Sequence, residues 1–218
     1  FSLFSQKALS IRENHCDIDD FKAFKDSLII NMPNRTLYDL QMLSAYHMAF
    51  SQNACNFSVP GAGKTSVVYG AYTYLKNLPA NDIKKVDRLL IIGPLSSFGP
   101  WESEYAECFG RKPTSKRLVG QMSLEDKKQY LYDFNPAEIT LLSYASVPSL
   151  IDELLHFLSV NKVIVVLDEA HKIKNTSGGI TATSVMQLAE KSKARVVLTG
   201  TPAPNGYEDL CNLFKFIW

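Results

Sequence analysis

The stretch from 56 to 70, "NFSVPGAGKTSVVYG", combines residue types that can bind phosphate. Gly61 and Gly63 allow the backbone to turn sharply and direct its N–H groups at phosphate oxygens. Lys64 adds a full positive charge, the start of a helix adds a partial one, and the Thr65 hydroxyl can ligate magnesium. A simple glycine turn is the alternative, but the predicted strand, loop and helix favour a nucleotide-binding loop. Its predicted ATP contacts are Pro60, Gly61, Ala62, Gly63, Lys64, Thr65 and Ser66.

A second motif, "KVIVVLDEAHKIKN", places two adjacent acids at the end of an apolar segment. Carboxylates next to a core are costly unless something pairs with them, and magnesium and a water nucleophile are suitable partners. Asp168 is predicted to hold magnesium and Glu169 to polarise the attacking water. His171 is close enough in sequence to communicate between the nucleotide and another bound molecule. The alternative is a solvated acidic turn.

A third motif, "VVLTGTPAPNGYEDLCNLFKF", contains Thr199, Gly200 and Thr201 after another apolar segment. Threonine hydroxyls at a strand end can bond both to an acidic motif and to phosphates. As an isolated string this signal is weak, because threonine-glycine turns are common. After the two preceding motifs, it predicts a coupling element between the phosphates and the acidic pair.

Alternating strands and helices must position these motifs. Strand, helix, strand in repetition indicates an α/β fold with a mostly parallel sheet covered by helices on both faces. Ligands bind outside the carboxyl ends of such strands, which is where all three motifs occur. The predicted strands are 53–58, 86–93, 115–120, 138–144, 162–168 and 194–200; the predicted helices are 17–29, 36–50 with Thr36 as cap, 64–78, 124–134, 148–158 and 181–191.

Composition is ordinary for a soluble globular domain, with 46% hydrophobic and 21% charged residues in 218. Apolar runs are too short to cross a membrane, and the start does not resemble a signal peptide. The net charge of +1 indicates no global basic field, so any nucleic-acid contact must be local. Four scattered cysteines predict neither a metal site nor disulfides. The chain is expected to be part of a longer protein.

The strings "SVPGAGKT", "DEAHKIKN" and "LTGTPAPN" resemble motifs I, II and III of superfamily-two helicases. More narrowly, they resemble those of the Swi/Snf-type ATPases, which translocate on double-stranded DNA. "TLYDLQ" is similar to the motif whose glutamine contacts adenine, which implies that role for Gln41. "GPLSSFGPWESEY" resembles motif Ia, which implies a DNA-backbone contact by the loop 94–101, with Trp101 mainly a packing residue.

This resemblance covers about residues 36–218 and implies the first RecA-like, P-loop lobe. We therefore predict a lobe at 35–218 with a small helical accessory arm at 1–34. The implied activity is DNA-dependent ATP hydrolysis with ATP and magnesium. The implied partners are duplex DNA and a second RecA-like lobe that supplies arginine fingers, so an isolated first lobe should be weakly active or inactive. No membrane partner is expected.

The string "FSVP" before the loop and Pro204 after "TGTP" depart from the family pattern. They suggest a divergent, bacterial or phage-related branch of the family. The expected location is the cytoplasm, in association with the nucleoid, or the nucleus if the source is eukaryotic. Two other functions remain open. One is a strand-separating helicase or the motor subunit of a restriction-type complex, and the other is a nucleotide-gated DNA-binding scaffold.

Overall fold

The computed structural model of the protein describes residues 6, 9–11, 13, 15, 17–173, 179–204 and 206–218. Lys174, Asn175 and Asn205, which belong to the motifs compared above, lie outside the described residues, as does Cys16. Within the described part, Cys55, Cys108 and Cys211 are free thiols.

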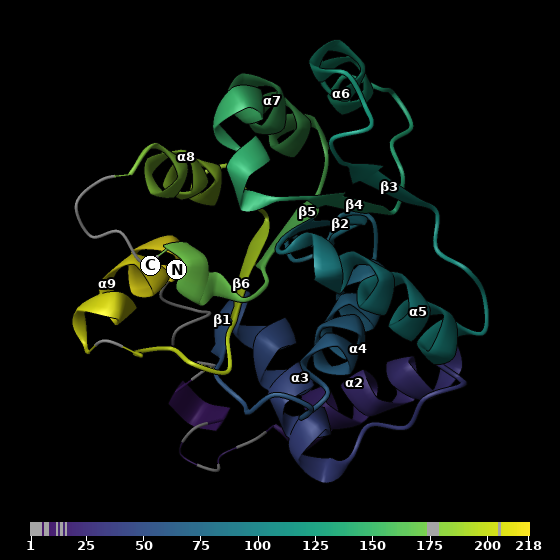
Figure 1. The fold of residues 1–218 in the computed structure, drawn as a ribbon. Coiled ribbons are helices and arrows are strands. Elements are labelled where there is room, and N and C mark those ends of the chain that lie inside the picture. The colour runs from purple at the N-terminus through teal and green to yellow at the C-terminus, as the bar shows by residue number, and fades with distance from the viewer. Residues whose placement is uncertain are drawn as a thin grey trace.

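Six parallel strands form one sheet in the order β1-β6-β5-β2-β4-β3 (Figure 1). The predicted α/β class and the six predicted strands are therefore confirmed. β5 lies inside the sheet between β6 and β2, as its nearly continuous apolar sequence indicates. The strands are β1 Asn53–Asn56, β2 Arg88–Ile92, β3 Ser115–Leu118, β4 Ile139–Leu142, β5 Val163–Leu167 and β6 Ala194–Leu198.

Helices cover both faces of this sheet (Figure 1). Alternate side chains of β5 enter two separate cores: Ile164 and Val166 join one, and Val165 and Leu167 the other. The first core is covered by α2 Ile18–Asn31, α3 Asp39–Ser51, α4 Lys64–Lys76 and α5 Phe98–Phe109. The second is covered by α6 Leu124–Leu131, α7 Ile151–Val160, α8 Ile180–Ala189 and α9 Glu208–Ile217. Short 3₁₀ segments are η1 Leu95–Ser97, η2 Tyr144–Ser146, η3 Pro148–Leu150 and η4 Ala170–Ile173.

Several element ends differ by a few residues from the sequence-based expectation, and for two of them a side-chain contact gives the reason. The predicted Thr36 cap is wrong, because α3 begins at Asp39 and the Gln41 side chain accepts the Tyr38 N–H at 3.1 Å. The first strand ends at Asn56 rather than within 57–58. The Asn56 Oδ1 atom accepts the Ser58 N–H at 3.0 Å and thereby turns the chain out of the strand.

The helix predicted in the N-terminal arm is present as α2, and the Asp17 side chain caps it by accepting two backbone N–H groups. Phe24 is fully buried in the core shared with α3 and α4, with its ring 5.5 Å from that of Tyr46. The domain boundary at residue 34 stays a prediction, but α2 packs as part of the same core as the strands. Among the described residues, none of the helices has the length and apolarity needed to span a membrane.

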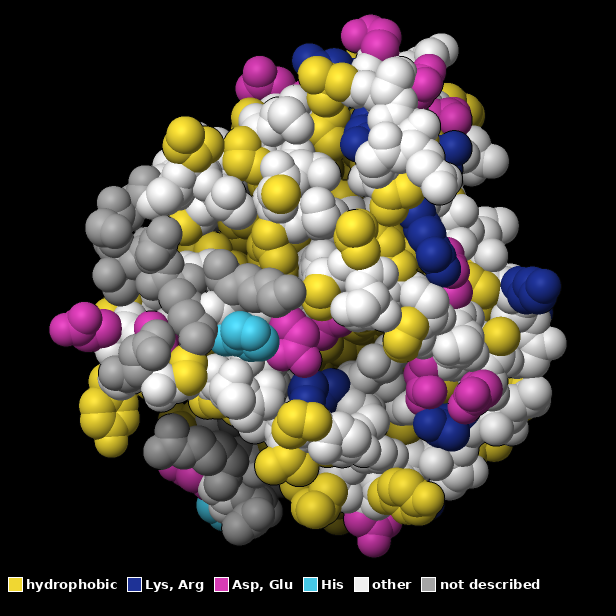
Figure 2. Space-filling model, in the orientation of Figure 1, with side chains coloured by type: hydrophobic (Ala, Val, Ile, Leu, Met, Phe, Trp, Pro, Cys, Tyr) yellow, Lys and Arg dark blue, Asp and Glu magenta, His cyan; other side chains and the backbone are white. Residues whose placement is uncertain are grey.

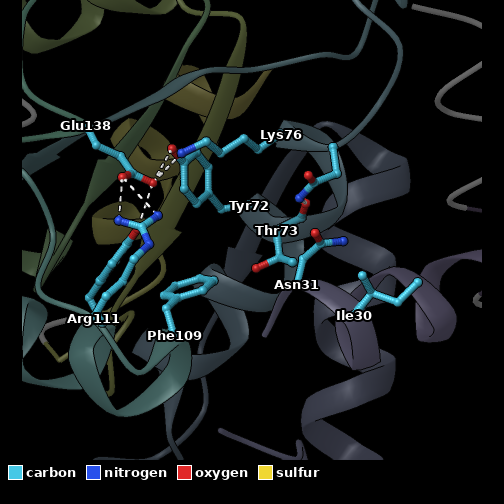
Figure 3. A pocket seen from close by; sticks show the side chains of 10 residues that line it. Ile30, Asn31, Tyr72, Thr73, Lys76, Phe109, Arg111 and Glu138 are labelled. Atoms are coloured by element: carbon cyan, nitrogen blue, oxygen red, sulfur yellow. Dashed lines mark hydrogen bonds and ion pairs between the residues drawn. The ribbon is translucent and has the colours of Figure 1, made fainter. Parts of the chain in front are cut away.

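A buried acidic residue anchors α4 to α5 at the edge of the sheet away from the three motifs. Glu138 accepts hydrogen bonds from the Lys76 ammonium and, at 2.9 Å, from the Tyr105 hydroxyl, and Arg111 lies 3.4 Å from it. Figure 3 shows Lys76 and Arg111 reaching Glu138 from two directions beside a pocket of about 310 Å³. Burial by itself raises the pKa of Glu138, but Lys76, Tyr105 and Arg111 outweigh it and hold the pKa below its ordinary value.

The variant Glu138→Gln is expected to lower the free energy of unfolding by about 2 kcal/mol at pH 7, because charged hydrogen bonds are lost. Since the folded-state pKa is lowered, this stability is present above the unfolded-state pKa and is lost as the pH falls through the folded-state value. Urea denaturation should therefore show the stabilities of the two proteins converging as the pH falls below the ordinary pKa of a glutamate. Exposed Glu190→Gln is the control. A difference that stays constant with pH would contradict the prediction.

Candidate active site

The predicted phosphate-binding loop connects β1 to α4, and α4 begins at Lys64 as expected. Gly61 and Gly63 have φ angles of 81° and 75°, a left-handed region that favours glycine. The Lys64 ammonium donates to the carbonyls of Ser58 and Val59 at 3.0 and 3.2 Å, so its charge lies against the loop. The loop therefore has the backbone shape and the cation that phosphate binding requires.

Gln41 of α3 supports this loop from the side. Its Nε2 atom donates to the Ala62 carbonyl at 3.0 Å, while its Oε1 atom accepts the Tyr38 N–H. A Cβ atom placed on Gly63 would clash with the Gln41 Nε2 atom. The close approach of loop and glutamine therefore depends on glycine at this position.

The variant Gly63→Ala is expected to lower the free energy of unfolding by about 1–3 kcal/mol, because it combines a left-handed φ with this steric clash. Chemical denaturation measures the effect, and nucleotide titration should show weaker binding because the Gln41 amide must move. Gly120→Ala is the matched control, since no atom lies within 4 Å of its added Cβ and its φ is not left-handed. Equal stability of the two variants would contradict the prediction.

The acidic pair follows β5 directly at the carboxyl edge of the sheet. The Asp168 carboxylate accepts the indole N–H of Trp101 at 2.9 Å, and its backbone carbonyl accepts the Tyr144 hydroxyl at 2.9 Å. Gly93 at the end of β2 leaves room for this residue, since an added Cβ would lie 3.1 Å from the Asp168 Cβ. Glu169 has a φ of 49°, which turns the chain sharply after the strand.

His171 joins the second and third motifs. Its Nδ1 atom lies 3.2 Å from the Thr199 hydroxyl and 3.2 Å from the Glu169 carboxylate. The same threonine hydroxyl accepts the Thr201 N–H at 3.2 Å. These contacts place the predicted coupling residues beside the acidic pair.

Gly200 brings the third motif against the predicted phosphate-binding loop. A Cβ on Gly200 would lie 2.9 Å from the Pro60 ring, so the two segments pack closely. In the orientation of Figure 1, Figure 2 shows a histidine beside acidic side chains, with a Lys or Arg side chain just below them. The three predicted motifs thus meet at one edge of the sheet.

The Ser66 residue is fully buried, whereas residues 60–65 before it are exposed or half-buried. Its hydroxyl bonds to Glu104, which also accepts from Arg35 at 2.6 Å. The sequence did not single out Arg35, Tyr144 or Gly93, and it predicted only a packing role for Trp101. For Gly93, the glycine at the end of an apolar strand was an available signal; the others depend on distant contacts.

The oxygen donors of Thr65 and Asp168 suit magnesium, which prefers oxygen ligands. Thr65 is half-buried in the first turn of α4, and Asp168 follows the end of β5. In the described part of the chain, no group of three or more His, Cys, Asp or Glu side chains could hold a metal. This arrangement fits magnesium that is bound together with substrate phosphates rather than in a cage made by the protein.

Comparison with known proteins shows similarity over most of the chain. A family model described as SNF2-related domain matches residues 51–218. The DNA repair protein rad5 of Neurospora crassa is 31% identical over 198 residues, covering 82% of this chain and 15% of that protein. The transcription regulatory protein SNF2 of Saccharomyces cerevisiae is 27% identical over 157 residues, covering 72% of this chain and 9% of that protein.

A solved structure described as the Sulfolobus solfataricus SWI2/SNF2 ATPase core domain is similar in fold. Its TM-score is 0.61 at 26% identity, and the match covers 84% of this chain and 35% of that one. The chain therefore spans only a small part of these curated relatives and about a third of the solved structure.

Proposed function

Because the chain belongs to the family of SNF2-related domains, we propose that it is the ATP-binding first lobe of an ATP-dependent double-stranded DNA translocase. The single observation that carries this proposal is the meeting of all three motifs at one sheet edge. There His171 lies 3.2 Å from both Glu169 and Thr199, so this histidine bridges the acidic pair and the third motif. A motor needs such a contact between its hydrolytic and coupling residues.

In the proposed site, the loop from Pro60 to Ser66 surrounds the ATP phosphates. Lys64 exchanges its carbonyl partners for phosphate oxygens, and Gln41 contacts adenine. Ser66 contributes its backbone N–H, since its hydroxyl is bonded to Glu104. Magnesium, when bound with ATP, offsets negative charge on the phosphates. Thr65 and Asp168 are the residues that would hold it.

Hydrolysis in this site requires one proton transfer. Water attacks the γ-phosphorus, the bond from that phosphorus to the β–γ bridging oxygen breaks, and Glu169 accepts the water proton. His171 keeps the Glu169 carboxylate oriented and transmits its position to Thr199. The second RecA-like lobe of the intact protein is proposed to supply arginine fingers, so this lobe alone should hydrolyse ATP poorly.

The proposed DNA contact is the first part of the predicted 94–101 loop, residues 94–97 between β2 and α5, because residues 98–101 form the first turn of α5 and not a loop. Ser96 in η1 is exposed and can donate to a backbone phosphate, whereas the Ser97 hydroxyl donates to the Pro94 carbonyl at 2.9 Å. Trp101 is buried, so base stacking is not part of the proposal. The two named curated relatives are eukaryotic proteins of DNA repair and transcription, and we therefore propose a nuclear rather than a bacterial location.

The test is ATP hydrolysis by the intact protein that carries this lobe. Rates are compared without nucleic acid and with single-stranded DNA, duplex DNA or structured RNA at one fixed salt concentration, because phosphate contacts depend on salt. Stimulation by duplex DNA alone, lost in Lys64→Ala, is the expected result. Stimulation by single strands or RNA would overturn the translocase in favour of a strand-separating helicase. No stimulation would overturn the motor and favour a nucleotide-gated scaffold.

A further inference from the structure

Trp101 connects α5 to the acidic pair through one specific contact. Its side chain is 1% exposed, and its indole Nε1 atom donates to the Asp168 Oδ2 atom at 2.9 Å. A buried indole N–H needs an acceptor, and few acceptors are available inside an apolar core. Here that acceptor is the carboxylate proposed to hold magnesium.

The orientation of the indole is set by the helix that follows the phosphate-binding loop. Tyr69 of α4 is fully buried and meets Trp101 edge to face, with ring centroids 5.4 Å apart and an interplanar angle of 85°. The Tyr69 hydroxyl also donates to the Trp101 backbone carbonyl at 2.6 Å. The indole therefore has a fixed position relative to α4, whose first residues belong to the phosphate-binding loop.

Asp168 is constrained on its backbone side as well. Tyr144 holds its carbonyl, and the missing side chain of Gly93 admits its Cβ. The bond to Trp101 uses one acceptor position of a carboxylate that has about four. Because an indole is neutral and only donates, it can orient the carboxylate without competing with a cation for the negative charge.

We propose that Trp101 is a positioning residue that orients the Asp168 carboxylate for magnesium. The proposal rests on the proposed function, because it concerns the same site. Some residues do not touch a metal but form a hydrogen bond with one of its ligands. Replacing such a residue typically lowers metal affinity by about 10- to 100-fold. The indole N–H would act in this way on the bond between magnesium and Asp168.

The experiment uses the intact protein and a fluorescent, non-hydrolysable ATP analogue. The Kd of the analogue is measured with magnesium and with EDTA, and the ratio of the two values is the magnesium gain. In Trp101→Phe we expect the gain to fall about tenfold, with the Kd in EDTA close to that of the unchanged protein. Trp218→Phe, which removes an indole that is 70% exposed, is the matched control and should keep the full gain.

A packing role would give a different result. Loss of packing would lower Tm or weaken binding equally with magnesium and EDTA, leaving the magnesium gain unchanged, and that outcome would overturn the proposal. In an Asp168→Asn background, Trp101→Phe should cause no further loss of gain; an additive loss would also count against it.

A second variant covers the case in which Trp101→Phe does not fold. Incorporation of 3-benzothienylalanine at position 101 replaces the N–H group by sulfur while keeping the ring shape, and it should reduce the gain in the same way. If the unchanged protein binds the analogue in neither condition, the proposed function and this inference both fail. If it shows a full magnesium gain that the isostere retains, only the inference fails.

Discussion

Replacement of Glu169 by glutamine is expected to lower kcat for ATP hydrolysis by about 10²- to 10⁴-fold, the usual contribution of a general base. An amide of nearly the same shape cannot accept the proton of the attacking water. The Kd for ATP should change little, because the proposed phosphate contacts come from the loop that starts α4. Single-turnover hydrolysis and nucleotide binding by the intact protein measure the two quantities separately.

Glu190→Gln is the matched control for this variant, because the same change is made at an exposed position after α8. It should retain both binding and hydrolysis. If Glu169→Gln binds ATP and stops hydrolysing it, the scaffold alternative is excluded. If it hydrolyses ATP at the original rate, Glu169 is not the base, and the contact with His171 at 3.2 Å has another purpose.

Phe24→Ala is expected to lower the free energy of unfolding of the chain by about 3–5 kcal/mol, as is usual for a large side chain removed from a core. Phe24 is fully buried, and its ring lies 5.5 Å from that of Tyr46 and 5.4 Å from that of Tyr74. Such a loss is a large part of the total of about 5–15 kcal/mol that stabilises a typical domain. Urea denaturation followed by circular dichroism measures it.

Ile29→Ala on the same helix is the control, since this side chain is 63% exposed and its loss should cost less than about 0.5 kcal/mol. The pair of variants tests whether residues 1–34 form an accessory arm. If Phe24→Ala is as stable as Ile29→Ala, α2 is not part of the cooperative unit. The expected large difference would place α2 in the lobe itself.

Local patterns in the sequence were sufficient to predict the strands and most of the helices. The strand β5 itself is apolar at every position, and it lies inside the sheet with every residue buried. Helix and strand ends were less predictable where a nearby side chain bonds to the backbone. Gln41, for example, shifts the start of α3 by binding the Tyr38 N–H.

In the candidate site, too, some features could be predicted from the sequence and others could not. Its three motifs were predictable because parallel strands carry their carboxyl ends to one edge of a sheet. The contacts between motifs were not, since His171 and Thr199 are far apart in the chain and meet only because β5 and β6 are neighbours. The same holds for Trp101 and Asp168, which come together through the position of α5 beside the end of β5.

The sequence by itself therefore determined the fold class, the glycine-rich loop between a strand and a helix, and the position of the acidic pair at a strand end, because periodicity and turn chemistry act over a few neighbouring residues. Only the tertiary structure decided which side chain holds Asp168, where the Ser66 hydroxyl points, and that α2 belongs to the core. Those features depend on strand order and on helix packing, which bring together residues that no local pattern relates.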